Sequence, residues 1–224
     1  MTHPTDTPHL RITHAASCGI PAQSPGRLGV LGGAYNPITL AHLAIADAAV
    51  AEMQLHEVLF CLPQVPPHKA IYGASLEQRL DMMQLAVRDR SYATVGLCSH
   101  GLFLDIERAL RHVYALETEV FFITGRDAAE RILTWEYDDT ERALSEMFSA
   151  FQFIVCDREG AFVMPDDPRL TPYHSRIHHF AIPDGLDHIS STAIRERLQH
   201  GQPIDTLVPA AVADFIRQHD LYTG

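Results

Sequence analysis

Residues 28–42 read Leu-Gly-Val-Leu-Gly-Gly-Ala-Tyr-Asn-Pro-Ile-Thr-Leu-Ala-His, and this stretch decides the fold. Its apolar start predicts a short buried strand. The two adjacent glycines that follow let the backbone approach a ligand that a β-carbon would block, and the proline fixes the turn. A helix is expected to begin near Thr39 and His42, which lie on one face of its first turn. A strand that runs through a glycine turn into a helix start is typical of a phosphate-binding site.

A second polar helix start lies far down the chain, where Ser190, Ser191 and Thr192 precede Arg195. The hydroxyl residues are typical of a helix N-cap, and the arginine would then stand in the first turn. The helix dipole disfavours a cation there by about 0.3–1 kcal/mol, and an anion held between Arg195 and the helix N–H groups would remove that cost. Together, the two helix starts predict a site for a chain of phosphates.

His42 is the residue best placed to act on such an anion. The positive end of the helix dipole favours its neutral form, whereas a phosphate in the site would favour the imidazolium. The ring would then be positioned to stabilise charge that grows on a phosphoryl group. The alternative for this motif is structural: Thr39 would be a plain N-cap and His42 a half-buried surface histidine. The corresponding alternative for Arg195 is that it points to solvent.

Length and charge limit the classes of function. The chain has 224 residues, which suits one large domain or a domain with a small appendage. Its formal net charge of −11 argues against a general nucleic-acid binder. Because the chain is this acidic, a polyphosphate would bind only at a local basic cluster, together with a divalent metal. Lys69 is the only lysine, and arginine supplies the other cations. No stretch of the sequence is long and apolar enough to span a bilayer.

Residues 1–26 hold Pro, Thr, Ser and His without any period. They lack a basic segment followed by an apolar one, so they do not resemble a secretory signal. We therefore predict a mobile N-terminal extension over 1–26, a single domain over 27–224, and a cytoplasmic protein. The four cysteines are too far apart in sequence for a Cys-x-x-Cys motif, and no protein metal site is predicted.

Apolar runs rich in β-branched and aromatic residues alternate with segments whose apolar residues recur at spacings of three and four. The runs predict strands over Arg27–Gly32, Glu57–Leu62, Ala93–Leu97, Glu119–Thr124, Gln152–Cys156 and Ile177–Ile182. The other segments predict helices over Leu40–Met53, Ser75–Arg88, Asp105–Leu116, Ala128–Trp135, Arg142–Ala150, Thr192–His200 and Val208–His219. A surface excursion is expected over Met164–Tyr173. This alternation predicts an α/β fold with a parallel sheet and helices on both faces, whose ligands bind outside the carboxyl ends of the strands.

The two motifs, taken together, resemble those of the nicotinate or nicotinamide mononucleotide adenylyltransferases of the nucleotidyltransferase superfamily. Further segments are similar in the same order: Pro66-Pro67-His68-Lys69, Gly125-Arg126-Asp127 followed by Trp135, Asp157-Arg158-Glu159-Gly160, and Leu207 through Tyr222. The resemblance covers residues 27–222 and implies a Rossmann-like fold of the nucleotidyltransferase type. It implies adenylyl transfer from ATP to nicotinate mononucleotide, giving deamido-NAD and pyrophosphate in NAD biosynthesis. No enzyme nucleophile is needed, because a phosphate oxygen attacks.

The resemblance also implies roles for individual residues. The catalytic groups would be His42, Thr39 and Arg195. ATP would be bound by Gly32, Gly33, Ala34, His42, Gly125, Asp127, Arg158, Ser191, Thr192 and Arg195. The pyridine mononucleotide would be bound by Tyr35, Asn36, Lys69 and Trp135, with the indole ring stacked on the pyridine. Mg²⁺ would be bound through the ATP phosphates. Neither a nucleic acid nor a membrane is expected as a partner, and the sequence leaves a homo-oligomer open.

The chain departs from the family pattern at four places. Ala34 replaces a Ser or Thr, Thr39 replaces the first histidine of the bacterial pattern, and Ala41 replaces a glycine. The largest departure is residues 101–108, where the bacterial pattern Gly-x-Ser-Tyr-Thr-x-Asp-Thr has lost its hydroxyl residues; core packing is the favoured interpretation of Phe103 there. Two alternatives follow: a nucleotidyltransferase that acts on a different phosphorylated acceptor, or a nucleotide-binding module without turnover.

Overall fold

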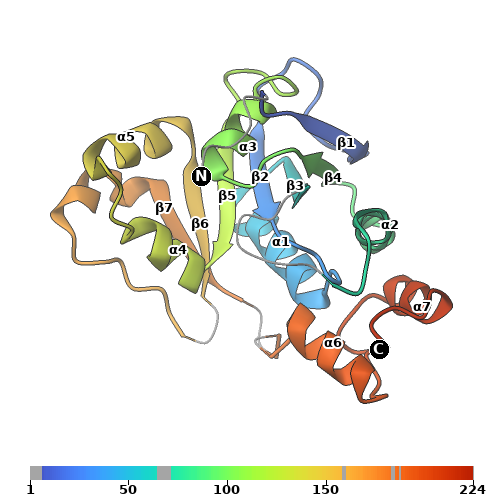
Figure 1. The fold of residues 1–224 in the computed structure, drawn as a ribbon. Helices are drawn as coiled ribbons and strands as arrows, with labels where there is room; N and C mark the ends of the chain where they lie inside the picture. Colours follow the sequence, from blue (N-terminus) through green and yellow to red (C-terminus); the bar gives the residue numbers. More distant parts are fainter. Residues whose placement is uncertain (1–6, 65–71, 158–159, 183–184, 187, 224) are drawn as a thin grey trace.

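The computed structural model of this chain describes residues 7–64, 72–157, 160–182, 185–186 and 188–223, and its centre is a seven-stranded sheet (Figure 1). The spatial order is β1-β4-β3-β2-β5-β6-β7, and all neighbours pair in parallel except β1 with β4. The strands are β1 (Leu10–His14), β2 (Arg27–Gly32), β3 (Glu57–Pro63), β4 (Ala93–Cys98), β5 (Glu119–Gly125), β6 (Gln152–Asp157) and β7 (Ile177–Ala181). The six predicted strands are confirmed to within one residue at either end.

Helices cover both faces of the sheet, as predicted. They are α1 (Leu40–Met53), α2 (Leu76–Val87), α3 (Phe103–Leu110), α4 (Arg126–Leu133), α5 (Thr140–Ala150), the 3-10 helix η1 (Pro168–Arg176), α6 (Ser191–Gln199) and α7 (Ala210–Gln218). Buried side chains of α1, α2, α6 and α7 belong to one hydrophobic cluster, and those of α3, α4, α5 and η1 belong to a second.

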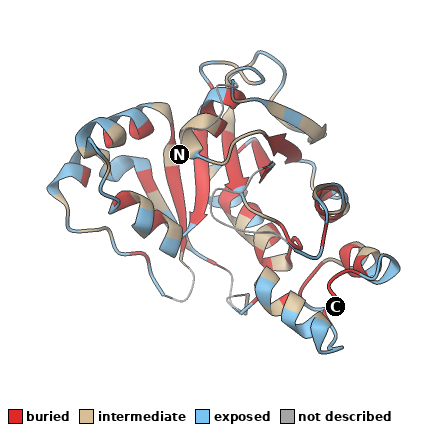
Figure 2. Ribbon diagram, viewed as in Figure 1, coloured by how far each residue is buried: buried red, intermediate tan, exposed pale blue. Residues whose placement is uncertain are grey.

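The two clusters meet at the sheet, because successive side chains of a strand point to opposite faces. Val58 and Phe60 of β3 belong to the first cluster, whereas Leu59 and Cys61 belong to the second. Every residue of β3 is buried, which is expected of a parallel strand covered on both faces. Figure 2 shows this arrangement as buried strands between helices whose outer sides are exposed.

The order of the strands reverses beside β2. From β2 the chain moves outward through β3 to β4, and it then crosses back to β5, which pairs with the other side of β2. In open α/β sheets a ligand binds in the crevice at such a switch point, outside the carboxyl ends of the strands. The glycine turn after β2 and the start of α4 after β5 both lie at this end. The predicted α/β fold is therefore confirmed, with the crevice where the two motifs require it.

Strand β1 was not predicted. Leu10–His14 pair antiparallel with β4, and the following segment is tied to the sheet by the N–H of Ile20, which donates to Glu57 Oε2 at 2.8 Å. The prediction that residues 1–26 form an extension outside the domain is wrong for residues 10–14. The partner strand of this short segment lies more than 80 residues away, so no local pattern announces the pairing.

Several helix boundaries also differ from the prediction: α4 and α5 begin two residues earlier than predicted, and α7 begins two residues later. Helix α3 begins at Phe103 and ends at Leu110 rather than running over 105–116, because the Arg111 side chain donates to the carbonyl oxygens of Leu116 and Thr118 and folds that stretch into turns. The expected surface excursion over 164–173 contains the start of η1, and its Leu170 is fully buried in the second cluster.

Candidate active site

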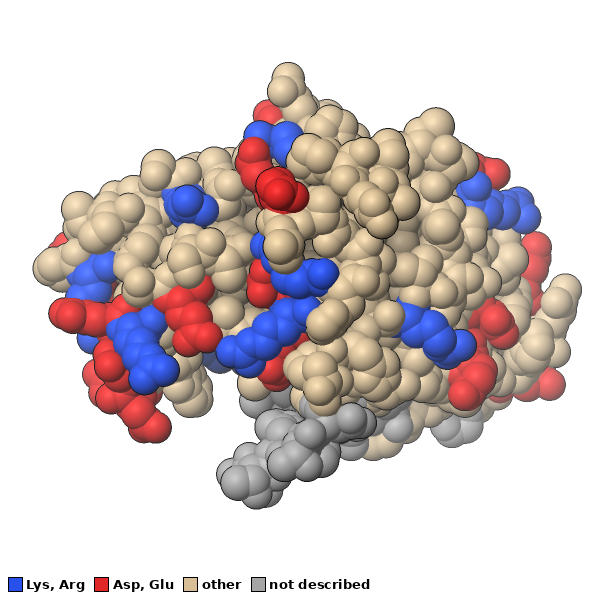
Figure 3. All heavy atoms as spheres, turned by 90° about the horizontal axis from the view of Figure 1, so that it is seen from above, with Lys and Arg blue, Asp and Glu red and all other residues tan. Residues whose placement is uncertain are grey.

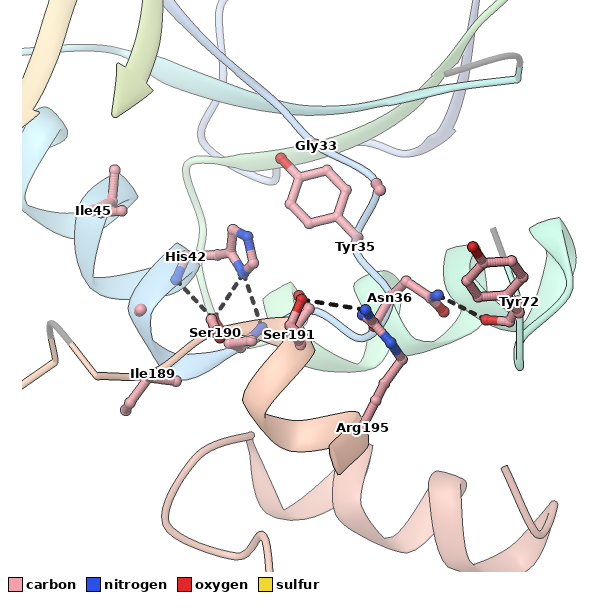
Figure 4. A pocket seen from close by; sticks show the side chains of 14 residues that line it. Gly33, Tyr35, Asn36, His42, Ile45, Tyr72, Ile189, Ser190, Ser191 and Arg195 are labelled. Atoms are coloured by element: carbon pink, nitrogen blue, oxygen red, sulfur yellow. Dashed lines mark hydrogen bonds between the residues drawn. The ribbon is translucent and has the colours of Figure 1, made fainter. Parts of the chain in front are cut away.

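The first turn of α1 is closed by a capping box between Thr39 and His42 (Figure 4). The main-chain N–H of His42 donates to Thr39 Oγ1 at 3.3 Å, and the main-chain N–H of Thr39 donates to His42 Nδ1 at 3.1 Å. The imidazole takes the place that a Glu or Gln side chain fills in most such boxes. Thr39 is fully buried, so its side chain acts on the helix start and on His42. This is the N-cap role of the structural alternative.

The same contacts fix where His42 carries its proton. A main-chain N–H can only donate, so the Nδ1 that accepts from Thr39 bears no hydrogen. The Thr39 hydroxyl lies 2.7 Å from this nitrogen as well. A neutral imidazole with a bare Nδ1 carries its proton on Nε2, at the opposite edge of the ring. Figure 4 shows that edge turned away from the helix start. His42 is therefore held as an Nε2–H donor.

Helix α6 begins beside the same turn. Ser190 is its N-cap, and the Ser190 hydroxyl accepts from the N–H of Ala193 at 3.1 Å. The next hydroxyl, of Ser191, donates to the carbonyl oxygen of Pro37 at 2.8 Å. Residues separated by about 150 positions in the sequence are thus joined directly, so the start of α6 is fixed against the segment that leads into α1.

Arg195 points from the first turn of α6 toward the turn before α1 (Figure 4). Its Nη1 donates to the main-chain oxygen of Asn36 at 2.8 Å, and its Nη2 donates to Thr192 Oγ1 at 3.2 Å. These contacts orient the guanidinium, which stays charged at any working pH. The alternative, that this arginine projects into solvent, is wrong.

Both helix starts open into one cavity of about 320 Å³, a size within the range of small-molecule sites. It is lined by the turn 33–36, by Thr39 and His42 from α1, and by 190–192 with Arg195 from α6. No Asp or Glu stands among the described residues that line it, so Arg195 sets the sign of its charge. The prediction that the two motifs converge on one site is confirmed.

The main chain at the start of α1 is less available to an anion than the sequence indicated. The N–H of Leu40 donates to the carbonyl of Leu207 at 2.9 Å, and the N–H of His42 is taken by the cap. An anion at this end of the cavity would therefore meet the His42 ring before it met these two amides.

The turn after β2 is built from buried side chains. Tyr35 exposes 1% of its surface, its ring packs on Phe60 and His42, and its hydroxyl donates to the carbonyl of Leu31. Asn36 exposes 6%, and its Nδ2 donates to the carbonyl of Tyr72 at 2.9 Å. Both residues were expected to contact the mononucleotide directly. Both line the cavity, and their buried side chains also hold the turn.

Open space lies over two glycines at the carboxyl ends of neighbouring strands. A β-carbon at Gly32, the last residue of β2, or at Gly125, the last of β5, would meet no atom of the described residues within 4 Å. Gly33 differs, because a β-carbon there would come within 3.2 Å of the Tyr35 ring. No described side chain therefore packs directly over the main chain at these two strand ends.

The residues expected at the other end of the ligand do not line the cavity. Asp127 is exposed in the first turn of α4, and Trp135, two residues after the end of α4, is 57% exposed. Ala34 and Ser191 do line the cavity. Lys69 and Arg158 were also expected to bind substrate, and they lie outside the described residues.

Phe103 lies in an aromatic cluster of the core. Its ring centroid is 4.6 Å from that of Phe122, and it meets Phe151 and Phe153 at 6.2 and 5.7 Å. The Phe103 side chain therefore packs against the core, in agreement with the core-packing interpretation.

The surface opposite α6 and α7 carries mixed charge. Figure 3 shows basic and acidic side chains interspersed on that face, without a continuous basic area. None of the helices in the described ranges has the length and apolar character that crossing a membrane requires.

Two residues that support the site were not predicted from the sequence. Arg79 donates to the carbonyl of Ala34 at 2.9 Å, and the Tyr222 hydroxyl donates to Asn36 Oδ1 at 2.7 Å. Arg79 could have been noticed, because it stands on the otherwise apolar buried stripe of α2. Nothing in the sequence singles out Tyr222, whose contact joins the last turn of the chain to the first motif.

The fold and the two-helix site define the class of protein. A crevice at the switch point of a parallel sheet, with a histidine and an arginine over helix starts, is the architecture of a nucleotidyltransferase, and the sequence model of the cytidylyltransferase-like family matches residues 30–197. Two relatives named "Probable nicotinate-nucleotide adenylyltransferase" are similar over 88% of this chain. That of Moorella thermoacetica is 34% identical with 92% of its length covered, and that of Thermoanaerobacter sp. is 32% identical with 94% covered.

A solved structure agrees at the level of the fold. The nicotinic acid mononucleotide adenylyltransferase of Plasmodium falciparum, complexed with NaAD, superposes with a TM-score of 0.63 at 21% identity, over 88% of this chain and 97% of that one. This structural similarity shows the fold alone, whereas the relatives that are more than 30% identical show the family. This chain belongs to the nicotinate-nucleotide adenylyltransferase family.

Proposed function

We propose that this protein transfers the adenylyl group of ATP to nicotinate mononucleotide, giving deamido-NAD and pyrophosphate. The observation that carries the proposal is one cavity shared by His42 and Arg195, with no carboxylate in its described lining. Family membership supports the same reaction, because the relatives in two bacteria are named for it.

The reaction needs alignment and charge neutralisation. An oxygen of the acceptor 5′-phosphate attacks the α-phosphorus of ATP in line; a new P–O bond forms, and the bond from the α-phosphorus to the bridging oxygen breaks. Pyrophosphate leaves with the electron pair of that bond. Negative charge grows on the departing phosphates, where the Nε2–H of His42 and the guanidinium of Arg195 would donate. Thr39 contributes by keeping the proton of His42 on Nε2.

The donor set fits a metal ion that arrives with the nucleotide. No carboxylate lines the described part of the cavity, and the described residues hold no group of three or more His, Cys, Asp or Glu that could hold a metal. Phosphate oxygens and water would therefore be the ligands of Mg²⁺, which neutralises phosphate charge when it is bound. The adenosine ribose would lie over Gly32 and Gly125, and the pyridine would lie toward Trp135.

One observation favours a second candidate, adenylyl transfer to another phosphorylated acceptor. Phe103 has replaced a family hydroxyl with a core side chain, and a site that lacks such donors discriminates less well among polar substrates.

Pyrophosphate release with ATP–Mg²⁺ and a set of acceptors separates these candidates. We expect release with nicotinate mononucleotide, tested beside nicotinamide mononucleotide, ribose 5-phosphate and phosphopantetheine. Faster release with ribose 5-phosphate or phosphopantetheine would show that this compound, and not nicotinate mononucleotide, is the preferred acceptor. Binding of ATP without release from any acceptor would show a module without turnover.

A further inference from the structure

The turn Ala34–Pro37 is held from outside by three distant segments. Arg195 of α6 donates to the carbonyl of Asn36, and Arg79 of α2 donates to the carbonyl of Ala34. Tyr222, two positions before the last residue of the sequence, donates to the side-chain oxygen of Asn36 at 2.7 Å. The turn itself leads directly into α1, so its shape determines where His42 stands relative to Arg195.

Arg79 is unusual because it is a buried cation whose contacts are with the main chain. Only 4% of its surface is exposed. Among the described residues its guanidinium donates to two carbonyl oxygens, of Ala34 at 2.9 Å and of Ser75 at 3.4 Å. Burial lowers the pKa of Arg79 from its ordinary value, yet arginine remains charged. Burying a charge is costly, so a position that keeps one has a specific use for it.

Tyr222 is fixed in a conformation that a tyrosine rarely adopts. Its φ is +65°, in the left-handed region, and it exposes 5% of its surface. The ring lies so close to Gly73, whose φ is +91°, that a β-carbon there would come within 2.6 Å of it. Burial raises the pKa of Tyr222, so the hydroxyl keeps the proton that it donates to Asn36. Left-handed residues of this size persist only where their surroundings require them.

A second tyrosine in this part of the molecule also has a left-handed backbone conformation. Tyr35, inside the turn, has a φ of +45°. Asn36 lies between the two tyrosines, and its Nδ2 is also engaged, with the carbonyl of Tyr72. A strained turn with each of these contacts in place can hold only one shape, whereas loss of one buried donor leaves Asn36 Oδ1 unsatisfied and the turn able to move.

We propose that Tyr222 and Arg79 are positioning residues that hold the turn Ala34–Pro37, and thereby the spacing of Arg195 from His42, in the geometry that phosphate binding requires. Neither lines the cavity, so both act through the turn. The inference rests on the proposed function only in the choice of substrates. The proposal adds that Tyr222, outside the cavity, influences the active site through its contact with Asn36.

The test compares two tyrosines that each lose one hydroxyl. In Tyr222→Phe the donor to Asn36 is lost while the ring stays over Gly73. Tyr114→Phe is the matched control, because the Tyr114 hydroxyl also donates to a side-chain oxygen, that of Glu57 at 2.6 Å, at the amino end of β3. We expect kcat/KM for ATP to fall about tenfold in Tyr222→Phe and to stay within twofold of wild type in Tyr114→Phe. The thermal unfolding midpoint of each variant shows how far its stability is lowered.

Arg79→Gln gives a second measure through a different atom of the turn. We expect kcat/KM for ATP to fall by at least tenfold. In the double variant with Tyr222→Phe we expect less than the product of the two single effects, because both act through one turn. If the fold-changes of the two single variants multiplied in the double variant, Arg79 and Tyr222 would act independently, which would contradict a shared action through the turn. Unchanged activity in Tyr222→Phe, or an equal fall in Tyr114→Phe, would overturn the proposal.

Failure of the proposed function is distinguishable from failure of this inference. Wild-type protein that releases no pyrophosphate with any acceptor would refute the function alone. The variants would then be compared by calorimetric binding of ATP–Mg²⁺, where we expect at least threefold weaker binding for Tyr222→Phe and unchanged binding for Tyr114→Phe. Equal affinities for wild type and Tyr222→Phe would refute the positioning role.

Discussion

Between α1 and α6, the crevice is built by hydrogen bonds that the protein makes with itself. Arg195 is held on Asn36, Ser191 on Pro37, and His42 on Thr39. At the two ends of α4 the chain offers instead open space over Gly125 and an exposed Trp135. The first region is therefore prepared for phosphates before any arrive, whereas the second must be completed by its ligand. Catalytic power should reside in the first region and the choice of acceptor in the second.

The largest effect is expected at His42. Removal of the ring in His42→Ala should lower kcat/KM by 10²–10³-fold, about 2.7–4 kcal/mol, because the Nε2–H donor to the departing phosphates is lost. Pyrophosphate release under first-order conditions measures this. His200→Ala is the control, an exposed histidine one residue past the end of α6, and it should behave as wild type. A loss of less than tenfold in His42→Ala would mean that the prepared region is not where the chemistry is assisted.

Phe103→Ala should act on stability and spare the chemistry. Removal of a ring from the cluster with Phe122 and Phe151 should lower the free energy of unfolding by about 2–4 kcal/mol. Urea unfolding measures the loss. Leu102→Ala is the control, since that side chain is half-exposed at the start of α3 and should cost under about 0.5 kcal/mol. If Phe103→Ala instead raised the KM of the acceptor at unchanged stability, Phe103 would be a ligand contact.

Trp135→Ala tests the second region directly. We expect the KM of nicotinate mononucleotide to rise about tenfold, near 1.4 kcal/mol, while the KM of ATP stays constant, because only the pyridine loses its stacking partner. Leu116→Ala removes a similarly exposed apolar side chain and should change neither constant. An equal rise in both KM values would place Trp135 outside the acceptor region and weaken the contrast.

The smallest effect concerns pH and the half of the sheet beyond β5. Burial and the nearby Arg27 lower the pKa of His178 on β7 below its ordinary value of 6.5. The unfolded chain therefore binds this proton more readily than the folded one, and stability falls as pH drops below about 6.5. In His178→Gln the midpoint of unfolding should depend less on pH between 5 and 7. The slope of the wild-type protein is the reference, and an unchanged slope in His178→Gln would contradict this assignment.

Most of the fold was predictable because strands buried on both faces leave continuous apolar runs in the sequence. Strand β3 is such a run, and its bounds were predicted to within one residue. Strand β1 was missed for the opposite reason: it is a short, half-exposed edge strand whose stability comes from β4. Helix α3 was predicted too long because the chain turns after Leu110, where the Arg111 side chain donates to the main-chain oxygens of Leu116 and Thr118.

The candidate site was predictable where local motifs carry it. The N-caps Thr39 and Ser190 follow from residue type and spacing, and their convergence follows from the strand order. The burial of Tyr35 and Asn36 does not, because polar groups become structural only through partners brought by the tertiary fold. The contact between Tyr222 and Asn36 spans 186 positions, so only the folded chain reveals it.

Strand β1 has a consequence for how this protein behaves in a crowded solution. Without it, the rim of the sheet would be β4, whose Ala93–Cys98 are all buried and would offer unpaired amides on an apolar ribbon to any other β-strand. With it, the rim is a five-residue strand that alternates charged or polar side chains such as Arg11 and Thr13 with apolar ones, and whose register slips near His14. A short, irregular and partly polar rim is a poor template for fibril growth, so the opening residues help to keep the molecules apart.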